Sequence, residues 1–112
     1  RRWEFPQGTA PELADVEPRE LAGRELREET GLSADSLDAL GEIDLAPGTS
    51  SQRGWVFLAT GIVEGRPQRE HEEQDMTSAW FAREDLERMI RTGEITDAQS
   101  IAAYCLFLLR ER

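Results

Sequence analysis

Cysteine is almost absent from this chain, in which Cys105 is the single cysteine among 112 residues. One thiol cannot form an intramolecular disulfide, so a disulfide-stabilised scaffold is excluded, and the reducing cytoplasm is the expected location. Long hydrophobic runs are missing too. No segment approaches the ~20 apolar residues that cross a bilayer, so we expect a soluble protein without a membrane partner.

Basic residues are also scarce. Lys and Arg number 13 against 23 Asp and Glu, which gives a formal net charge of −10. Such a charge repels a nucleic-acid backbone, so no nucleic-acid partner is expected. With 38% hydrophobic and 32% charged residues, the chain fits one compact domain over residues 1–112, and it is too short for two independent cores.

Helix signals are strongest in the first third of the chain. A helix is predicted over residues 18–30, because Asp15 or Glu17 can cap it. Pro18 suits its first turn and Gly31 suits its left-handed end. Two later helices are predicted over Glu84–Arg91 and after a cap at Thr96 or Asp97. The last helix has an apolar stripe expected to pack on the sheet: Ile101, Ala102, Cys105, Leu106 and Leu109.

Four segments combine strand-forming residues with turn signals at their ends: Trp3–Pro6, Leu40–Leu45, Trp55–Thr60 and Ser78–Phe81. The loop over residues 46–52 has strong turn chemistry, so the second and third segments are expected to form a near-antiparallel pair. Trp3, Trp55 and Trp80 are expected in the core rather than against an adenine ring, and Cys105 is expected to be a buried, inert thiol.

The predicted helix carries three glutamates on one face. With successive residues 100° apart, Glu29 lies about 40° to one side of Glu25 and Glu28 about 60° to the other. Leu21 falls in the same sector, and partial burial there makes the repulsion between like charges worse. Mg²⁺ or Mn²⁺ would reverse that effect, so the pattern favours a metal site and a phosphate-containing substrate. A solvated acidic helix is the alternative.

The run from Arg24 to Leu32 resembles the second half of the Nudix box, G-x5-E-x7-R-E-U-x-E-E-x-G-U, where U is apolar. It reads Arg-Glu-Leu-Arg-Glu-Glu-Thr-Gly-Leu and matches at every specified position. The first half departs from the pattern, because Gly8 lies sixteen residues before Arg24 instead of fourteen. Val16 stands where a glutamate is expected, and Glu12 or Glu17 could supply that carboxylate.

The resemblance implies a set of site residues. Glu25, Glu28 and Glu29 would be catalytic metal ligands, together with the backbone carbonyl of Gln7. Arg24 would hold a box carboxylate with its guanidinium and so fix the ligand geometry, and Glu17 is a second supporting residue. The residues expected to bind substrate are Glu4, Ser51 and Gln52.

Residues 46–52 and 93–100 extend the resemblance to the subgroup that includes ADP-ribose pyrophosphatases. In those relatives a loop glutamate after the central strands helps to activate water. Glu72 and Glu73 are the preferred candidates here. His71 is an alternative base, and a merely solvated acidic loop is the alternative interpretation of the whole segment.

The implied fold is an α/β/α sandwich with a mixed sheet. We expect this chain to lack the N-terminal strands of that sheet, and to be N-terminally incomplete. The expected activity is Mg²⁺-dependent cleavage of ADP-ribose, or of a similar nucleoside diphosphate derivative, to AMP and a sugar phosphate, in a homodimer. The alternatives are a nucleoside triphosphate or NADH-type dinucleotide pyrophosphatase, and a non-catalytic nucleotide-sensing module.

Overall fold

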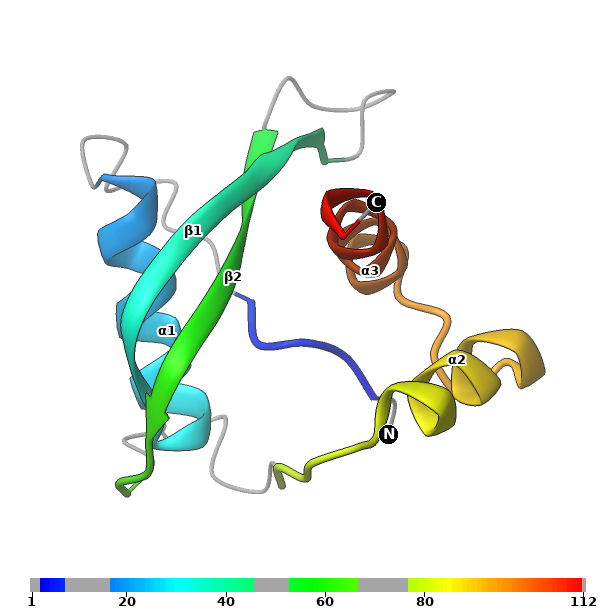
Figure 1. Cartoon of the computed structure of the whole chain (residues 1–112), viewed down its shortest axis with the longest axis horizontal. Helices are drawn as coiled ribbons and strands as arrows, with labels where there is room; N and C mark the ends of the chain where they lie inside the picture. The colour runs from blue at the N-terminus through cyan, green and yellow to red at the C-terminus, as the bar shows by residue number, and fades with distance from the viewer. Residues whose placement is uncertain (1–2, 8–16, 46–52, 67–76, 112) are drawn as a thin grey trace. The chain divides into compact units, whose positions relative to one another are not determined.

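The computed structural model describes residues 3–7, 17–45, 53–66 and 77–111, which hold three helices and two strands (Figure 1). In chain order they are α1 (Pro18–Thr30), β1 (Ser33–Asp44), β2 (Arg53–Val63), α2 (Arg83–Thr92) and α3 (Ala98–Arg110). The predicted α/β class is confirmed. None of the helices in these ranges combines the length and the apolar character that a bilayer crossing requires.

The residues form two compact units. The α1 unit contains Pro6–Ala39 and Phe57–Ala79, and the α2–α3 unit contains Arg1–Phe5, Leu40–Val56 and Trp80–Arg112. Both strands therefore supply residues to each unit. The single domain over residues 1–112 stays a prediction.

Helix α1 has the bounds that the sequence predicts, because its end signals are local. Of the two candidate caps, Glu17 is the N-cap, and its carboxylate accepts a hydrogen bond of 3.0 Å from the Glu20 backbone N–H. Asp15 lies outside the described residues. Gly31 ends the helix at φ 77°, where its N–H donates to the Arg27 carbonyl at 2.9 Å. A left-handed residue here satisfies a carbonyl that the helix leaves unpaired.

The two strands form an antiparallel pair, as predicted. Arg53 at the start of β2 lies 3.2 Å from Asp44 at the end of β1, whereas Gly61 near the end of β2 packs on Asp35 near the start of β1. Both strands are longer than predicted. Residues 33–39 are rich in Ser, Asp and Ala, which have low strand propensity, so their strand form depends on pairing with β2.

Contacts with α1 also hold the first half of β1 (Figure 1). The Arg19 Nε donates to the Leu37 carbonyl at 2.8 Å. Gly23 has no side chain, and a Cβ at that position would lie 3.5 Å from Leu37 Cδ1, so helix and strand approach closely. These contacts come from tertiary packing, which is why the sequence pattern did not place residues 33–39 in a strand.

Two predicted strands are wrong. Neither Trp3–Pro6 nor Ser78–Phe81 is a strand in the structure. The Phe5 N–H donates to the Ser100 hydroxyl at 2.9 Å instead of to a strand partner. A strand needs a neighbouring ladder, and the sheet in the described ranges consists of β1 and β2 alone.

The buried side of α3 also differs from the prediction. Asp97 is the N-cap, and its carboxylate accepts from both the N–H and the hydroxyl of Ser100. The helix buries Ser100 and Tyr104, which are 3% and 7% exposed. Leu106 contacts β1 at Gly41, as expected for the apolar stripe. Three other residues of the stripe are exposed: Ile101, Cys105 and Leu109.

Several residues predicted to be buried are therefore on the surface. Cys105 is an exposed thiol. Trp3, Trp55 and Trp80 are 37%, 48% and 69% exposed, so the prediction that they form the core is wrong. Among the residues that the structure describes, the buried hydrophobic ones are Met89, Ile95 and Tyr104, which all belong to the α2–α3 unit. A polar side chain such as Ser100 can replace an apolar one inside because its hydrogen bonds are satisfied.

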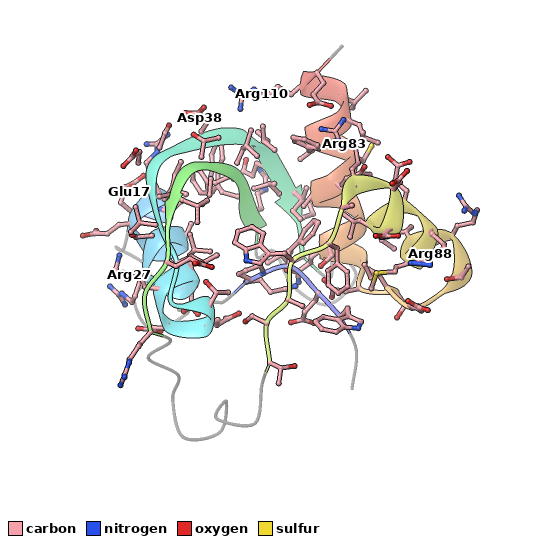
Figure 2. All side chains as sticks on the ribbon, turned by 60° about the horizontal axis from the view of Figure 1, so that its bottom comes forward. Glu17, Arg27, Asp38, Arg83, Arg88 and Arg110 are labelled. Carbon is pink, nitrogen blue, oxygen red and sulfur yellow. The ribbon has the colours of Figure 1, made fainter. Side chains whose placement is uncertain are left out.

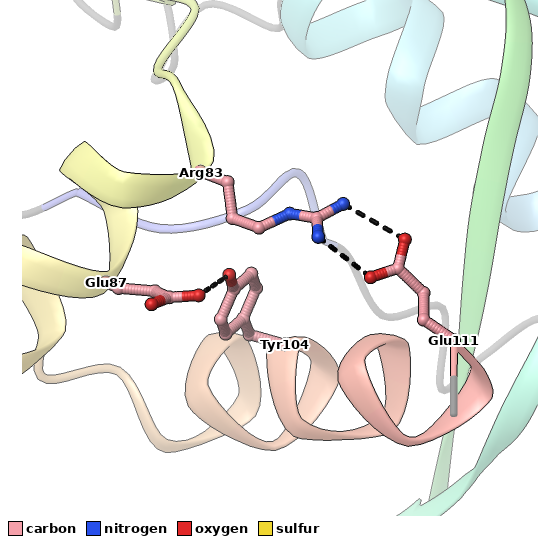
Figure 3. A network of polar contacts seen from close by, with 4 residues as sticks. All are labelled: Arg83, Glu87, Tyr104 and Glu111. Atoms are coloured by element: carbon pink, nitrogen blue, oxygen red, sulfur yellow. Dashed lines mark hydrogen bonds and ion pairs between the residues drawn. The ribbon is translucent and has the colours of Figure 1, made fainter.

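Polar contacts join α2 to α3 and to Glu111, the C-cap of α3 (Figure 3). The Arg83 guanidinium forms a two-pronged ion pair with Glu111, at 2.8 and 3.0 Å, and its central carbon lies 4.9 Å from the Phe107 ring centroid. The Tyr104 hydroxyl donates to the Glu87 carboxylate. Such contacts fix the register of one helix on the other.

Tyr104 provides a spectroscopic test of this packing, because it is the chain's one tyrosine. Burial, the hydrogen bond to Glu87 and the negative charge of that carboxylate raise the pKa of Tyr104 to about 12. The folded state thus holds the proton more tightly than the unfolded state. The resulting stability is complete below pH ~10 and is lost as the pH rises through the folded pKa.

We expect the tyrosinate absorbance of the folded protein to titrate with a midpoint near 12, and that of the protein in urea near 10. Glu87→Gln should shift the folded midpoint downward, because it removes the negative charge. Equal midpoints for the folded and urea-unfolded protein would contradict the contact.

Candidate active site

The carboxylate face of α1 is partly buried, as its position among apolar residues predicts. Glu29 is 6% exposed, and Glu25 and Glu28 are of intermediate exposure. The helix holds all three within two turns because its ends are fixed by Glu17 and Gly31. Burying a carboxylate is costly unless it has hydrogen bonds or a cation, so the burial of Glu29 requires a polar environment.

The donor chemistry of this face suits a hard divalent cation. Three carboxylates supply only oxygen, the ligand atom that Mg²⁺ and Mn²⁺ prefer. Gln7, whose carbonyl is a predicted ligand, belongs to the same α1 unit and is half-buried. In the described ranges, no three His, Cys, Asp or Glu side chains converge as they would around an ion. The glutamates share a face without meeting at one point, and their ligand roles stay predictions.

Two predicted supporting residues have definite positions. Glu17 caps α1, and its other carboxylate oxygen lies 4.0 Å from Arg19. Arg24 lies beside a cavity between α1 and β1, and among the described residues it forms no ion pair with a box glutamate. Both are thus placed at α1, while their roles in supporting metal ligands remain to be tested.

Glu4 belongs to the α2–α3 unit. Partial desolvation, and the negative charge of Asp97 at the α3 cap, raise the pKa of the Glu4 carboxyl. Its substrate-binding role stays a prediction. The other residues singled out in the sequence lie outside the described residues: Glu12, Val16, Ser51, Gln52, His71, Glu72 and Glu73.

A cavity that the sequence did not predict lies on another side of α1 from the three glutamates. It has a volume of about 430 Å³ and is lined from α1 and the start of β1, with Arg19, Arg24 and Arg27 among its residues. Of these three arginines, only Arg24 has a role predicted from the sequence, as the partner of a box carboxylate. A helical wheel could have separated the other two from the glutamates, because Arg19 and Arg27 lie about 120° and 160° from Glu25.

Comparison with known proteins shows a family and two relatives that this chain resembles. Residues 1–104 match the NUDIX domain family. An ADP-ribose pyrophosphatase of Mycobacterium tuberculosis (strain ATCC 25618 / H37Rv) is 44% identical over 103 residues, which make up 91% of this chain and 49% of that protein. A solved structure described as an ADP compounds hydrolase has a TM-score of 0.67 and 25% identity, and the match covers 83% of this chain and 49% of the other. The chain spans about half the length of these relatives.

Proposed function

Because the chain belongs to the NUDIX family, we propose that it supplies the catalytic helix of a hydrolase that cleaves the diphosphate of ADP-ribose or a similar nucleoside diphosphate derivative. The observation that carries this proposal is the buried carboxylate of Glu29, on a helix face shared with Glu25 and Glu28. Both relatives are named for ADP-containing compounds, which favours this substrate class over triphosphates.

Glu25, Glu28 and Glu29 would hold the divalent ion, with the carbonyl of Gln7 as a further ligand. When bound, such an ion lowers the pKa of a coordinated water and neutralises negative charge on the phosphate oxygens. The protein's part is to keep three carboxylates on one rigid helix. Helix α1 does so through its Glu17 cap and its left-handed Gly31 end.

Hydrolysis adds water across the phosphorus–oxygen–phosphorus linkage. The water oxygen bonds to one phosphorus, the bridging oxygen leaves with the other, and the products are AMP and a sugar phosphate. Glu72 or Glu73 would accept the proton from water, and Arg24 would orient a metal-binding carboxylate. The substrate would contact Glu4, Ser51 and Gln52. No covalent intermediate with the protein is required.

The finer assignments have separate support. We infer Mg²⁺ as the physiological ion because the donor set is all oxygen, with Mn²⁺ as a substitute. We infer a homodimer, for which the exposed apolar residues of α3, Ile101, Leu108 and Leu109, offer a surface. The cytoplasm is inferred from the cysteine content alone.

A substrate panel tests the proposal. The protein is incubated with Mg²⁺ and, separately, with ADP-ribose, other nucleoside diphosphate sugars, NADH and nucleoside triphosphates, and products are identified by anion-exchange chromatography. ADP-ribose should give the highest kcat/KM. A preference for triphosphates or NADH would favour the other pyrophosphatase activities. No turnover of any compound would leave only the nucleotide-sensing module.

A further inference from the structure

The cavity between α1 and β1 has an unusual charge for this chain. Its lining includes three arginines, Arg19, Arg24 and Arg27, and one acidic residue, Glu20. The chain as a whole has a formal charge of −10, so this is a local concentration of positive charge on an acidic protein. A concave, positively charged surface raises the local concentration of anions.

One arginine is held in place by the protein itself. The Arg19 Nε donates to the Leu37 carbonyl at 2.8 Å, and its guanidinium lies 5.4 Å from the centroid of the Phe57 ring. The side chain therefore stands as part of the cavity wall. Its position is set before any ligand binds, which lowers the entropic cost of using it in recognition.

The other two arginines have unused donors. In the part of the chain that the structure describes, the guanidinium groups of Arg24 and Arg27 form no hydrogen bond or ion pair. Arg27, labelled in Figure 2, lies on α1 with its guanidinium beside Gly23, where a Cβ would be 3.9 Å from its Nη1. Each guanidinium presents five N–H donors in a planar fork that matches the oxygens of a phosphate.

We propose that this cavity binds a phosphate dianion, either free or as the phosphate group of a monoester. Phosphate is favoured over a carboxylate because its oxygens can accept from more than one guanidinium at once. Ser33, at the start of β1, adds a hydroxyl to the lining. The side of the cavity with Arg19 and Arg27 is separate from the catalytic face, since Arg27 lies about 160° around α1 from Glu25, and Arg24, at about 100°, lies between the two.

The test uses metal-free protein in EDTA, so that the carboxylate face cannot hold phosphate through an ion. Inorganic phosphate and ribose 5-phosphate are titrated at constant ionic strength, and binding is measured by calorimetry and by backbone amide shifts. We expect saturable binding at one site, with shifts concentrated in residues 19–27 and 33–37. Comparing the two affinities tells whether the free ion or the ester is the better ligand.

Arg27→Gln should weaken phosphate binding by about tenfold or more, because it removes one charged pair of hydrogen bonds. Arg27→Lys keeps the charge without the fork and should have an intermediate affinity. Arg88→Gln is the matched control, since Arg88 is an exposed helical arginine paired with Asp85 at 3.3 Å in α2. It should bind phosphate like the wild type.

Absence of saturable binding, or equal affinities of wild type and Arg27→Gln, would overturn the proposal. Equal weakening by Arg27→Gln and Arg88→Gln would also overturn it, because it would show only a general charge effect. Circular dichroism of each variant checks the fold. The result is independent of the proposed hydrolysis, since phosphate binding is measured without metal and turnover with it.

Discussion

Replacing Glu29 with glutamine is expected to lower the rate of ADP-ribose hydrolysis by at least about 100-fold. Mutating a residue that only supports a metal ligand already costs about 10- to 100-fold in metal affinity or activity, and loss of a ligand itself should cost more. Glutamine has the same shape as glutamate but lacks the negative charge that holds a divalent ion. Glu29 is the most deeply buried of the three carboxylates, at 6% exposure, so water cannot readily replace its oxygens. The rate is measured at saturating Mg²⁺ and ADP-ribose.

Glu20→Gln is the matched control. Glu20 belongs to the first turn of the same helix, lies about 140° from Glu25, and is exposed. It should change the hydrolysis rate by less than about twofold, as expected for a surface residue away from the chemistry. Full activity of Glu29→Gln at unchanged helix content would show that Glu29 is not a metal ligand.

Gly61→Ala is expected to cause the largest loss of stability among single substitutions in the described part of β2. Gly61 has φ 66°, a left-handed conformation that is costly for any residue with a Cβ. A Cβ there would lie 2.6 Å from the Asp35 Cβ, in the paired strand β1. Strain and overpacking together should reduce the free energy of unfolding by about 3 kcal/mol.

Gly93→Ala separates the two causes. Gly93 also has a positive φ, 86°, at the end of α2, but a Cβ there would meet nothing within 4 Å. Its substitution should cost only the backbone strain, about 1–2 kcal/mol. Urea denaturation of both variants measures the difference. Equal losses would mean that Asp35 does not restrict the position of residue 61.

Local signals made α1 predictable from sequence. The cap, the proline and the terminal glycine each act within a few residues, and the three glutamates follow from helical spacing alone. The same holds for the cap of α3, where Asp97 was one of two candidates and the structure selects it. The family resemblance needed only this local segment.

Features that depend on distant partners were not predictable in the same way. Residues 33–39 form a strand because β2 and α1 contact them, although their own propensity is low. The buried side of α3 is centred on Ser100 and Tyr104, because Asp97 and Glu87 satisfy their hydroxyl groups. The spacing of apolar residues along the sequence does not predict such hydrogen-bond partners, so it did not predict the buried side of α3.

The arginine-lined cavity could not be predicted from the sequence for a different reason. The charges of Arg19 and Arg27 are visible in the sequence, but the cavity exists only because α1 packs beside β1. Helical spacing predicts that these arginines and the glutamates lie on different faces of α1. It does not predict which of the two faces lines a cavity, because that depends on how α1 packs. The candidate base residues Glu72 and Glu73 lie outside the described residues, so their assignment still depends on the resemblance.

Hydrolysis of ADP-ribose in water enriched in ¹⁸O tests the central claim most directly. With Mg²⁺, the protein should release equimolar AMP and ribose 5-phosphate, with one ¹⁸O atom in the phosphate of one product, and EDTA should abolish the reaction. Mass spectrometry identifies the two products and shows which of them carries the ¹⁸O atom. Intact ADP-ribose after incubation with Mg²⁺, or products from cleavage of any other bond, would contradict the claim.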